Sequence, residues 1–553
     1  MNRYLLRFGT LERIGAIVLV VVFFGLIIRN NGLYPIVFAD EFTYSRFSRL
    51  ISFDKSLLPN YLYFFVYRLT NVCGDGYLGC ARIINILFFF SSLPFIYLVA
   101  RTCVSHGVSF LIVLLVLLGP VNSYVSYFMP ESMYFFSFWF FSWSVLKLNA
   151  ESSTRNWVVA GGVVGLSALV KPHTLFLLPA LLVYILIIKE VWVIKKMSRA
   201  AACAAALIFG ALLVKLAIGY SLAGNAGLTL FGEFYSPYGL AISKDFGYYA
   251  NLVSLAVNNL KGHLLALCLL YAVPVCLMLK FWLEYFGEPG KVLTNNKKVI
   301  MYSTLVIASL VAVTGLFTAS IATTEPLNHL HIRYYSFALP LLLIVASMNV
   351  GGEENSYGFR SRLFIGIPVG VLLVYAILTK LIPFQVHSST APEIYSVLAS
   401  TPLFYSIGGA SFLSLMLWIY SERVGSKAYL YIVVPLVVVV SGFYMNVSLR
   451  DRIVPDVFDR AALFANAYLD RAHRSKVVIV GATNQVGGLF RTLFHLDLEN
   501  TAYGIQTVEG SKKYDLATIP DGKDWVLVVG EHEVIGRVIL DIPGDGFSLI
   551  HVR

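Results

Sequence analysis

The sequence predicts a polytopic α-helical membrane protein, with about 13 transmembrane helices and a small α/β domain at the C-terminus. Of the 553 residues, 58% are hydrophobic and only 13% are charged, and the mean hydropathy is +0.74. A soluble domain carries roughly 25% charged residues. Apolar segments of about 17 to 22 residues recur along the chain, and each is long enough to cross the hydrocarbon core of a bilayer. After Leu449 the composition becomes polar and no further span follows.

The expected spans alternate with short polar connections. Arg3, Arg7 and Arg13 precede the first span, which places the start of that span in the cytoplasm. The even-numbered connections are then cytoplasmic, and they carry basic clusters such as Lys195, Lys196 and Arg199, as the positive-inside rule requires. The expected centres lie near Val20, Ile86, Leu114, Phe140, Val163, Leu182, Leu207, Leu270, Leu310, Leu342, Val371, Met416 and Val437.

The formal net charge of +11 does not indicate a nucleic-acid partner. The basic residues lie in short clusters between apolar spans, so membrane topology accounts for them. We expect membrane lipids, and no nucleic acid, as partners.

The outer connections are longer than the cytoplasmic ones. The first, about residues 30 to 80, contains aromatic-rich stretches within about 34–70 that predict helices lying in the membrane interface. Cys73 and Cys80 follow in the same connection, either as a disulfide or as two free thiols. A second long outer loop is expected from about Tyr220 to His263, and a shorter one near Pro383 to Ser400.

We divide the chain into a transmembrane module (1–448) and an outer α/β domain (449–553). The second part predicts a helix at about 456–472, a strand at Lys476 to Gly481, a helix from about Gln485 and a strand at Trp525 to Val529. The turn after Gly481 is similar to a dinucleotide-binding turn but lacks the G-x-G-x-x-G spacing. We therefore expect this turn only to begin a helix, with no nicotinamide or flavin cofactor.

The adjacent carboxylates Asp40 and Glu41 follow the first span and are expected at the outer membrane surface. Asp40 could cap the interfacial helix, with Glu41 in its first turn, but capping requires only one of the two. A carboxylate here could instead take a proton from an acceptor hydroxyl. Glu131 follows Pro130 at the outer end of the third span, so topology brings a third acid to the same face, where capping is again the structural alternative. Neighbouring acids could orient the acceptor or hold a divalent cation.

Two basic residues are expected at the same outer face. Lys171 ends the fifth span, and Arg333 begins a helix between the ninth and tenth spans. An ammonium and a guanidinium are both suited to binding a phosphate, although Lys171 could also simply snorkel. His329 and His331 lie close by in the sequence, as a metal pair or as polar loop residues.

These motifs resemble the membrane-embedded GT-C glycosyltransferases, a class that contains protein mannosyltransferases and lipid A aminoarabinose transferases. The resemblance rests on the sequences Asp40-Glu41, Pro130-Glu131, Lys171-Pro172 and His331-Ile-Arg-Tyr-Tyr335. It implies a GT-C-like fold and inverting transfer of a sugar from a polyprenyl-phosphate donor to a glycan, lipid or protein of the cell envelope, such as lipopolysaccharide. The C-terminal domain would then lie in the periplasm, beside a bacterial inner membrane.

The resemblance also implies roles for individual residues. Asp40, Glu41 and Glu131 are the expected catalytic residues, with Asp40 slightly favoured over Glu41 as base. The residues expected at the donor phosphate are Lys171, Arg333, His331 and Tyr334. Asp40 and Glu131 are the candidate ligands for a divalent cation, Mg²⁺ or Mn²⁺.

Two other classes stay open on the sequence. A lipid-sugar or polysaccharide flippase would have a similar number of spans, but its ionisable residues should lie at mid-membrane. An O-antigen polymerase or ligase should have a large outer loop rich in arginine, and residues 220–263 contain no arginine.

Overall fold

The computed structural model describes residues 10–190, 193–233, 246–287, 293–322, 325–351, 358–497, 505–508 and 513–552. The helices of the membrane part are α1 (Thr10–Asn30), α2 (Phe38–Arg49), α3 (Tyr61–Tyr67), α4 (Tyr77–Arg101), α5 (His106–Leu118), α6 (Glu131–Leu146), α7 (Thr154–Val170), α8 (Leu178–Ile188), α9 (Ile194–Ala223), α10 (Phe246–Gly287), α11 (Asn295–Ser320), α12 (Pro340–Ser347), α13 (Phe359–Thr379), α14 (Pro392–Leu398), α15 (Thr401–Tyr420), α16 (Glu422–Ala428) and α17 (Val434–Arg450). The C-terminal part contains α18 (Val457–Tyr468), α19 (Arg471–Arg474), α20 (Val486–Leu496), β1 (Val477–Ala482), β2 (Ile505–Val508), β3 (Tyr514–Asp515), β4 (Trp525–Val529), β5 (Val534–Ile535), β6 (Leu540–Gly544) and β7 (Phe547–His551).

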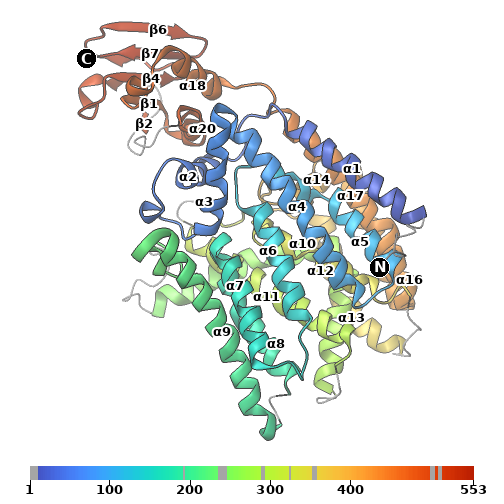
Figure 1. Ribbon diagram of the computed structural model, residues 1–553. Coiled ribbons are helices and arrows are strands. Elements are labelled where there is room, and N and C mark those ends of the chain that lie inside the picture. Colours follow the sequence, from blue (N-terminus) through green and yellow to red (C-terminus); the bar gives the residue numbers. More distant parts are fainter. Residues whose placement is uncertain are drawn as a thin grey trace.

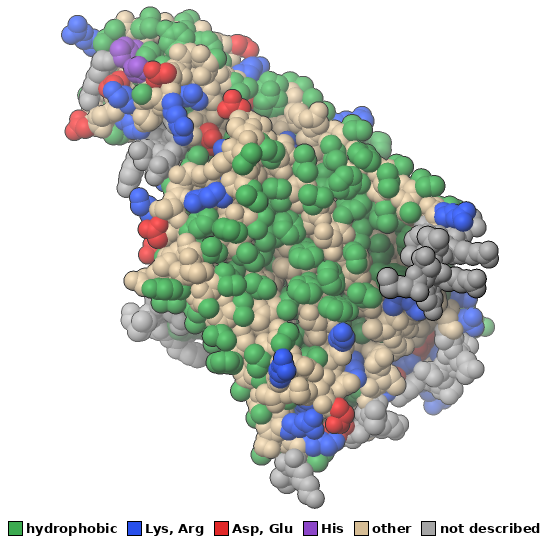
Figure 2. Space-filling view, viewed as in Figure 1, with side chains coloured by type: hydrophobic (Ala, Val, Ile, Leu, Met, Phe, Trp, Pro, Cys, Tyr) green, Lys and Arg blue, Asp and Glu red, His purple; other side chains and the backbone are tan. Residues whose placement is uncertain are grey.

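Each of the thirteen expected span centres lies in a helix of this structure. Within the described residues, 8 helices are long and apolar enough to cross a membrane, or 9 if α5 and the bent segment after it form one span. The expected centres at Phe140, Val163, Leu182 and Leu342 fall in shorter helices. Figure 2 shows hydrophobic side chains covering the middle of one face, with most Lys and Arg side chains toward its two ends. The chain is a multi-pass helical membrane protein.

Small residues allow α7 and α9 to pack closely. A Cβ atom added to Gly161 would lie 2.1 Å from the carbonyl oxygen of Leu207, and one added to Gly165 would lie 2.3 Å from that of Ala211. The earlier glycine, Gly161, meets Leu207, and the later one, Gly165, meets Ala211. Because both contacts advance by four residues in the same sense, the two helices run in the same direction. Close backbone approach at small residues is a common way to associate helices in a membrane.

The expected outer loop between Tyr220 and His263 is largely helical, which corrects that prediction. Helix α9 continues to Ala223, a short 3₁₀ helix covers Gly224–Leu228, and α10 begins at Phe246. Part of the expected loop, residues 234–245, lies outside the described residues. Asn258, Asn259 and Lys261 are polar residues within α10. In the structure the amide of Asn259 donates to the carbonyls of Leu327 and His329, so a buried polar contact stabilises this part of the helix.

The first outer connection forms the two expected helices, α2 and α3. Cys73, just before α4, forms a disulfide with Cys80 in the first turn of α4, which decides between the two alternatives left open by the sequence. Buried aromatic residues pack α3 against its neighbours. The Tyr63 ring lies 5.6 Å from that of Tyr44 in α2, and the Tyr67 ring lies 5.6 Å from that of Phe128.

The C-terminal domain is built on a five-stranded mixed sheet in the order β2-β1-β4-β7-β6. Strand β1 is parallel to β2 and β4, whereas β7 is antiparallel to β4 and β6. Ile479 and Leu527 belong to the core shared with α18 and α20, while Val478 and Val526 belong to a second cluster with Tyr514. The predicted elements of the domain are confirmed, including the turn after β1 that leads into α20.

The C-terminal domain contacts the first outer connection directly. Two nitrogens of the Arg49 guanidinium lie 2.7 and 2.9 Å from the carboxylate oxygens of Asp497. The Arg452 side chain donates to the carbonyl of Pro35, and the hydroxyl of Tyr77 donates to the carbonyl of Phe494. Figure 1 shows the sheet at one end of the molecule, with α20 beside α2. The helix that carries Asp40 and Glu41 therefore supports the C-terminal domain.

Candidate active site

The first turn of α2 holds both acids of the Asp40-Glu41 pair. The residue at the N-cap is Val37, whose own side chain makes no cap hydrogen bond. Glu41 instead reaches back, and its Oε2 accepts hydrogen bonds from the backbone N–H groups of Ile36 and Val37 at 2.5 and 2.7 Å. The capping role considered for Asp40 is therefore wrong, because Val37 is the N-cap and Asp40 lies inside the first turn.

Glu41 is completely buried, and its second oxygen is also occupied. Its Oε1 accepts a hydrogen bond of 2.7 Å from the backbone N–H of Phe128, in the segment before α6. Burial raises the pKa of the Glu41 carboxyl, although these backbone donors and the nearby Arg82 oppose that shift. Glu41 thus connects the start of α2 to the segment that leads to Glu131.

Asp40 points to a different group of residues and begins a chain of four charges. Its Oδ2 lies 2.9 Å from a terminal nitrogen of Arg333. The Nε of Arg333 lies 3.6 Å from Oε1 of Glu131, and the same oxygen lies 2.9 Å from Nζ of Lys171. Two carboxylates and two cations therefore balance within one cluster, which we call the four-charge centre.

The four-charge centre is buried except at one member. The side chains of Glu131, Lys171 and Arg333 are 7%, 4% and 9% exposed, whereas that of Asp40 is 42% exposed. Charges removed from water must be paired, and this cluster meets that requirement internally. Asp40 is the member that an incoming molecule can reach.

Local sequence places Glu131 and Lys171 at facing helix ends. Pro130 occupies the N-cap of α6, and Glu131 is the first helical residue, where the positive end of the helix favours a carboxylate. Lys171 follows the last residue of α7 with an extended backbone, and Pro172 prevents the helix from continuing. Both placements match the sequence predictions.

Arg333 lies in a 3₁₀ turn, Ile332–Tyr334, that residues 385–390 hold in place. Its backbone N–H donates to the carbonyl of Thr390, and Leu330 donates to the carbonyl of Gln385. Burial lowers the pKa of the Arg333 guanidinium, but Asp40 and Glu131 outweigh this effect and raise it above its ordinary value. Arg333 is therefore a permanent cation.

Tyr334 and His331 lie at the edge of the four-charge centre. Lys171 Nζ and Arg333 Cζ are 5.5 and 5.4 Å from the centroid of the Tyr334 ring. The His331 ring stacks on the Tyr334 ring, and the two centroids lie 5.5 Å apart. The structure thus brings all the predicted phosphate-binding residues together, with Lys171 and Arg333 in direct contact with carboxylates.

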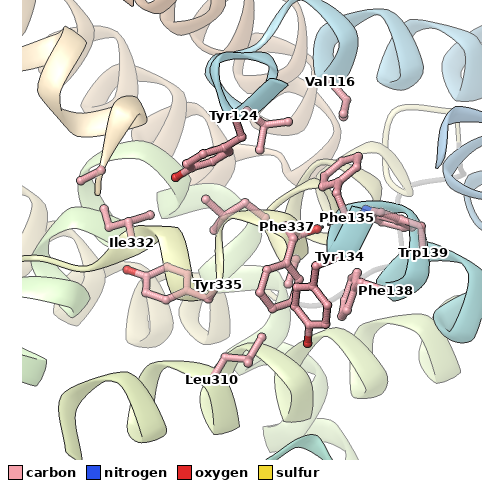
Figure 3. Close-up of a cluster of buried hydrophobic side chains, with 14 of the residues drawn as sticks. Val116, Tyr124, Tyr134, Phe135, Phe138, Trp139, Leu310, Ile332, Tyr335 and Phe337 are labelled. Atoms are coloured by element: carbon pink, nitrogen blue, oxygen red, sulfur yellow. Dashed lines mark hydrogen bonds between the residues drawn. The ribbon is translucent and has the colours of Figure 1, made fainter. Parts of the chain in front are cut away.

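An aromatic layer supports the four-charge centre. Figure 3 shows Tyr134 and Phe138 of α6 against Phe337, and their ring centroids lie 4.7 and 4.8 Å from that of Phe337. The indole N–H of Trp139 donates to the carbonyl of Phe337 at 3.1 Å. A cavity of about 10 Å³, with Tyr124 and Tyr134 in its wall, touches Glu131, Lys171 and Arg333, and it is about the size of one water molecule. These contacts fix α6 against the turn that carries Arg333.

Asp40 and Glu131, the expected ligands of a divalent cation, each lie against side-chain cations in this structure. Oδ2 of Asp40 faces Arg333, and Oε1 of Glu131 faces both Lys171 and Arg333. Metal binding at these two carboxylates stays a prediction, and a metal bound there would have to displace or share these partners.

Two further acids, the half-exposed Glu325 and the buried Glu393, were given no role by the sequence. Glu325 precedes His329 and His331 in the sequence, and an acid followed by two histidines is a recognisable ligand pattern. Glu393 is the only acid of the short helix α14, and it borders a cavity of about 60 Å³ with Tyr271 and Tyr429. Burial raises the pKa of Glu393 to about 7. A single glutamate in a short loop gives no sequence signal of such an environment.

Comparisons with known proteins give one family match and two similar structures. The model of the family described as dolichyl-phosphate-mannose-protein mannosyltransferase matches residues 54–214. None of the curated proteins matches the chain. The crystal structure of ArnT from Cupriavidus metallidurans bound to undecaprenyl phosphate has a TM-score of 0.48 at 13% identity, over 97% of each chain. The apo structure of the same protein has a TM-score of 0.44 at 14% identity, covering 93% of this chain and 92% of that one. The matched residues 54–214 contain Glu131 and Lys171, and over this stretch the match confirms the predicted resemblance to the protein mannosyltransferases.

Proposed function

We propose that this protein is an inverting GT-C-type glycosyltransferase, which moves a sugar from a polyprenyl-phosphate donor to a hydroxyl of a cell-envelope glycan, lipid or protein. The family match over residues 54–214 supports the class of reaction, since the donor in that family's description is a sugar on a polyprenyl phosphate. The observation that carries the proposal is the four-charge centre, in which two buried cations lie next to a partly exposed carboxylate.

The cations suit the leaving group of such a reaction. As the bond between the anomeric carbon and the phosphate oxygen breaks, the electron pair stays on the phosphate and negative charge develops there. Arg333 offers a planar set of donors and Lys171 a compact ammonium, and both are held in a site that water barely enters. In our proposal the donor phosphate takes the place beside Arg333 that Asp40 occupies in this structure.

Asp40 is the better candidate for the base. In the proposed step the acceptor oxygen attacks the anomeric carbon, and its proton passes to a carboxylate of Asp40. When the phosphate engages Arg333, Asp40 is released from that ion pair and becomes free to accept the proton. Glu41 is less suited, because both its oxygens accept backbone hydrogen bonds and its side chain is out of reach of solvent. Glu131 holds Lys171 in position.

The basic residues support a location of this centre on the outer side of the membrane. Lys189 donates to the carbonyls of Ala150 and Ser152, and Arg199 lies near Glu151, so a basic group surrounds the beginning of α7. Lys171 follows the other end of that 17-residue helix, about 26 Å away. We propose that the shorter helices also cross, giving 13 spans, with the C-terminal domain in the periplasm of a bacterial inner membrane.

The test follows transfer from labelled polyprenyl-phosphate sugars to extracted envelope material by the purified chain. We expect Asp40→Asn to lower turnover by a factor of about 10² to 10⁴, the usual contribution of a general base. Asp54→Asn is the matched control, because Asp54 lies exposed in the same outer connection. Full turnover in a folded Asp40→Asn protein would exclude Asp40 as base. Absence of transfer by the wild type from every donor would contradict the proposed function itself.

A further inference from the structure

A second cluster of ligand-type side chains lies in the segment between α11 and the turn of Arg333. Glu325, His329 and His331 each present one ligand atom, and these atoms all lie within 4.8 Å of one another. Nε2 of His331 is 2.9 Å from Oε2 of Glu325, and Nδ1 of His329 is 3.8 Å from the same oxygen. None of these three residues belongs to the four-charge centre.

His331 is buried without hydrogen-bond partners. Its side chain is 4% exposed, and neither ring nitrogen makes a hydrogen bond to any residue that the structure describes. Oε2 of Glu325 likewise makes none, so its short distance to His331 lacks hydrogen-bond geometry. Buried polar atoms are normally satisfied, and unsatisfied ones call for an explanation such as an ion.

A contact at Nε2 already orients the His329 ring. Its Nε2 lies 2.9 Å from the hydroxyl oxygen of Thr390, which leaves Nδ1 directed at Glu325. A histidine that binds a metal through one nitrogen usually donates from the other nitrogen to a nearby oxygen, which fixes the ring. Thr390 fits that supporting role.

We propose that Glu325, His329 and His331 bind one Zn²⁺ ion through Oε2, Nδ1 and Nε2. Two imidazoles and a carboxylate are typical zinc ligands, whereas Mg²⁺ and Ca²⁺ favour oxygen ligands alone. Ligand atoms about 2.1 Å from a tetrahedral ion lie about 3.4 Å apart. The two ligand distances of 2.9 and 3.8 Å bracket that value.

Three protein ligands leave a fourth position for water or another donor. The ring centroid of the exposed His387 lies 4.8 Å from that of His329, so His387 is a candidate for this fourth position. The ion would also fix His331 two residues before Arg333, and thereby the turn that holds Arg333. The inference does not depend on the proposed glycosyl transfer.

The experiment measures zinc in the full-length purified chain. The protein is stripped with a chelator, incubated with ZnCl₂, desalted and assayed for bound zinc by mass spectrometry, and Co²⁺ replaces zinc for an absorption spectrum of tetrahedral geometry. We expect about one zinc per chain in the wild type. Glu325→Gln and His331→Ala should each abolish tight binding, and Thr390→Val should weaken it by a factor of about 10 to 100.

His473→Ala serves as the matched control, since His473 is exposed in the C-terminal domain and paired with Asp470. It should keep the wild-type zinc content. Glu325 is itself 44% exposed, so Glu325→Gln should fold even if His331→Ala does not. Failure of the wild type to bind zinc, or equal zinc content in wild type and Glu325→Gln, would overturn the proposal.

Discussion

The ion pair between Glu131 and Lys171 gives a stability prediction that tests the buried four-charge centre. Lys171→Met removes a cation 2.9 Å from a carboxylate whose side chain is 7% exposed. Arg333 Nε, at 3.6 Å, is then the nearest cation left for Glu131. Breaking a buried pair costs about 3 to 5 kcal/mol, because the remaining charge is uncompensated. Glu131→Leu should cost a similar amount by leaving Lys171 unpaired.

The double variant Lys171→Met with Glu131→Leu removes both charges. Its loss in free energy of unfolding should be smaller than the sum of the single losses by about 2 to 3 kcal/mol. The assay is equilibrium unfolding in detergent, followed by tryptophan fluorescence, for the four proteins of the cycle. Lys513 and Glu533 provide the control cycle, because they are 2.7 Å apart but 49% and 67% exposed, and exposed pairs contribute less than about 1 kcal/mol. Additive losses at Glu131 and Lys171 would refute the buried pairing.

Three further predictions concern packing, pH and donor binding. Gly161→Ala places a Cβ against the Leu207 carbonyl and should lower the free energy of unfolding by about 1 to 3 kcal/mol. Gly25→Ala is the control, because a Cβ there has no neighbour within 4 Å. Equal unfolding midpoints for the two variants would contradict the close contact between α7 and α9. Burial raises the pKa of the Glu393 carboxyl from about 4.5 in the unfolded chain to about 7 in the folded protein. The protonated carboxyl therefore contributes its full stabilisation below about pH 4.5, and this stabilisation is lost as the pH rises through about 7. Glu393→Gln should therefore gain stability over wild type between about pH 5 and 8, by up to about 3 kcal/mol, and a pH-independent difference in melting temperature would exclude this. Arg333→Lys keeps the charge but loses the planar donors, so it should weaken donor use less than Arg333→Ala; equal KM values for the donor would argue against phosphate binding there.

Topology and local sequence were enough to predict which residues meet. The length of the apolar segments predicted a helix at every expected span, and alternation of sides predicted that Asp40, Glu131, Lys171 and Arg333 reach one face. The sequence could not predict that Glu41 is buried and hydrogen-bonded while Asp40 stays accessible. This difference depends on the N–H of Phe128, which is 87 residues from Glu41 in the chain. The same holds for Glu325, whose relation to the two histidines depends on how the loop folds back on residues 385–390.

The incorrect prediction of a loop between Tyr220 and His263 also comes from a contact between residues far apart in the sequence. Asn258 and Asn259 look like loop residues when helix propensity alone is considered. The Asn259 side chain instead donates to the carbonyls of Leu327 and His329, distant in the sequence, and this tertiary contact outweighs the local preference.

The most direct test of the central claim is an experimental structure of the chain with a bound polyprenyl phosphate. We predict that the phosphate lies within hydrogen-bond distance of Lys171 and Arg333 and that Asp40 no longer contacts Arg333. A phosphate bound elsewhere, with the ion pair between Asp40 and Arg333 intact, would contradict the proposed role of the four-charge centre.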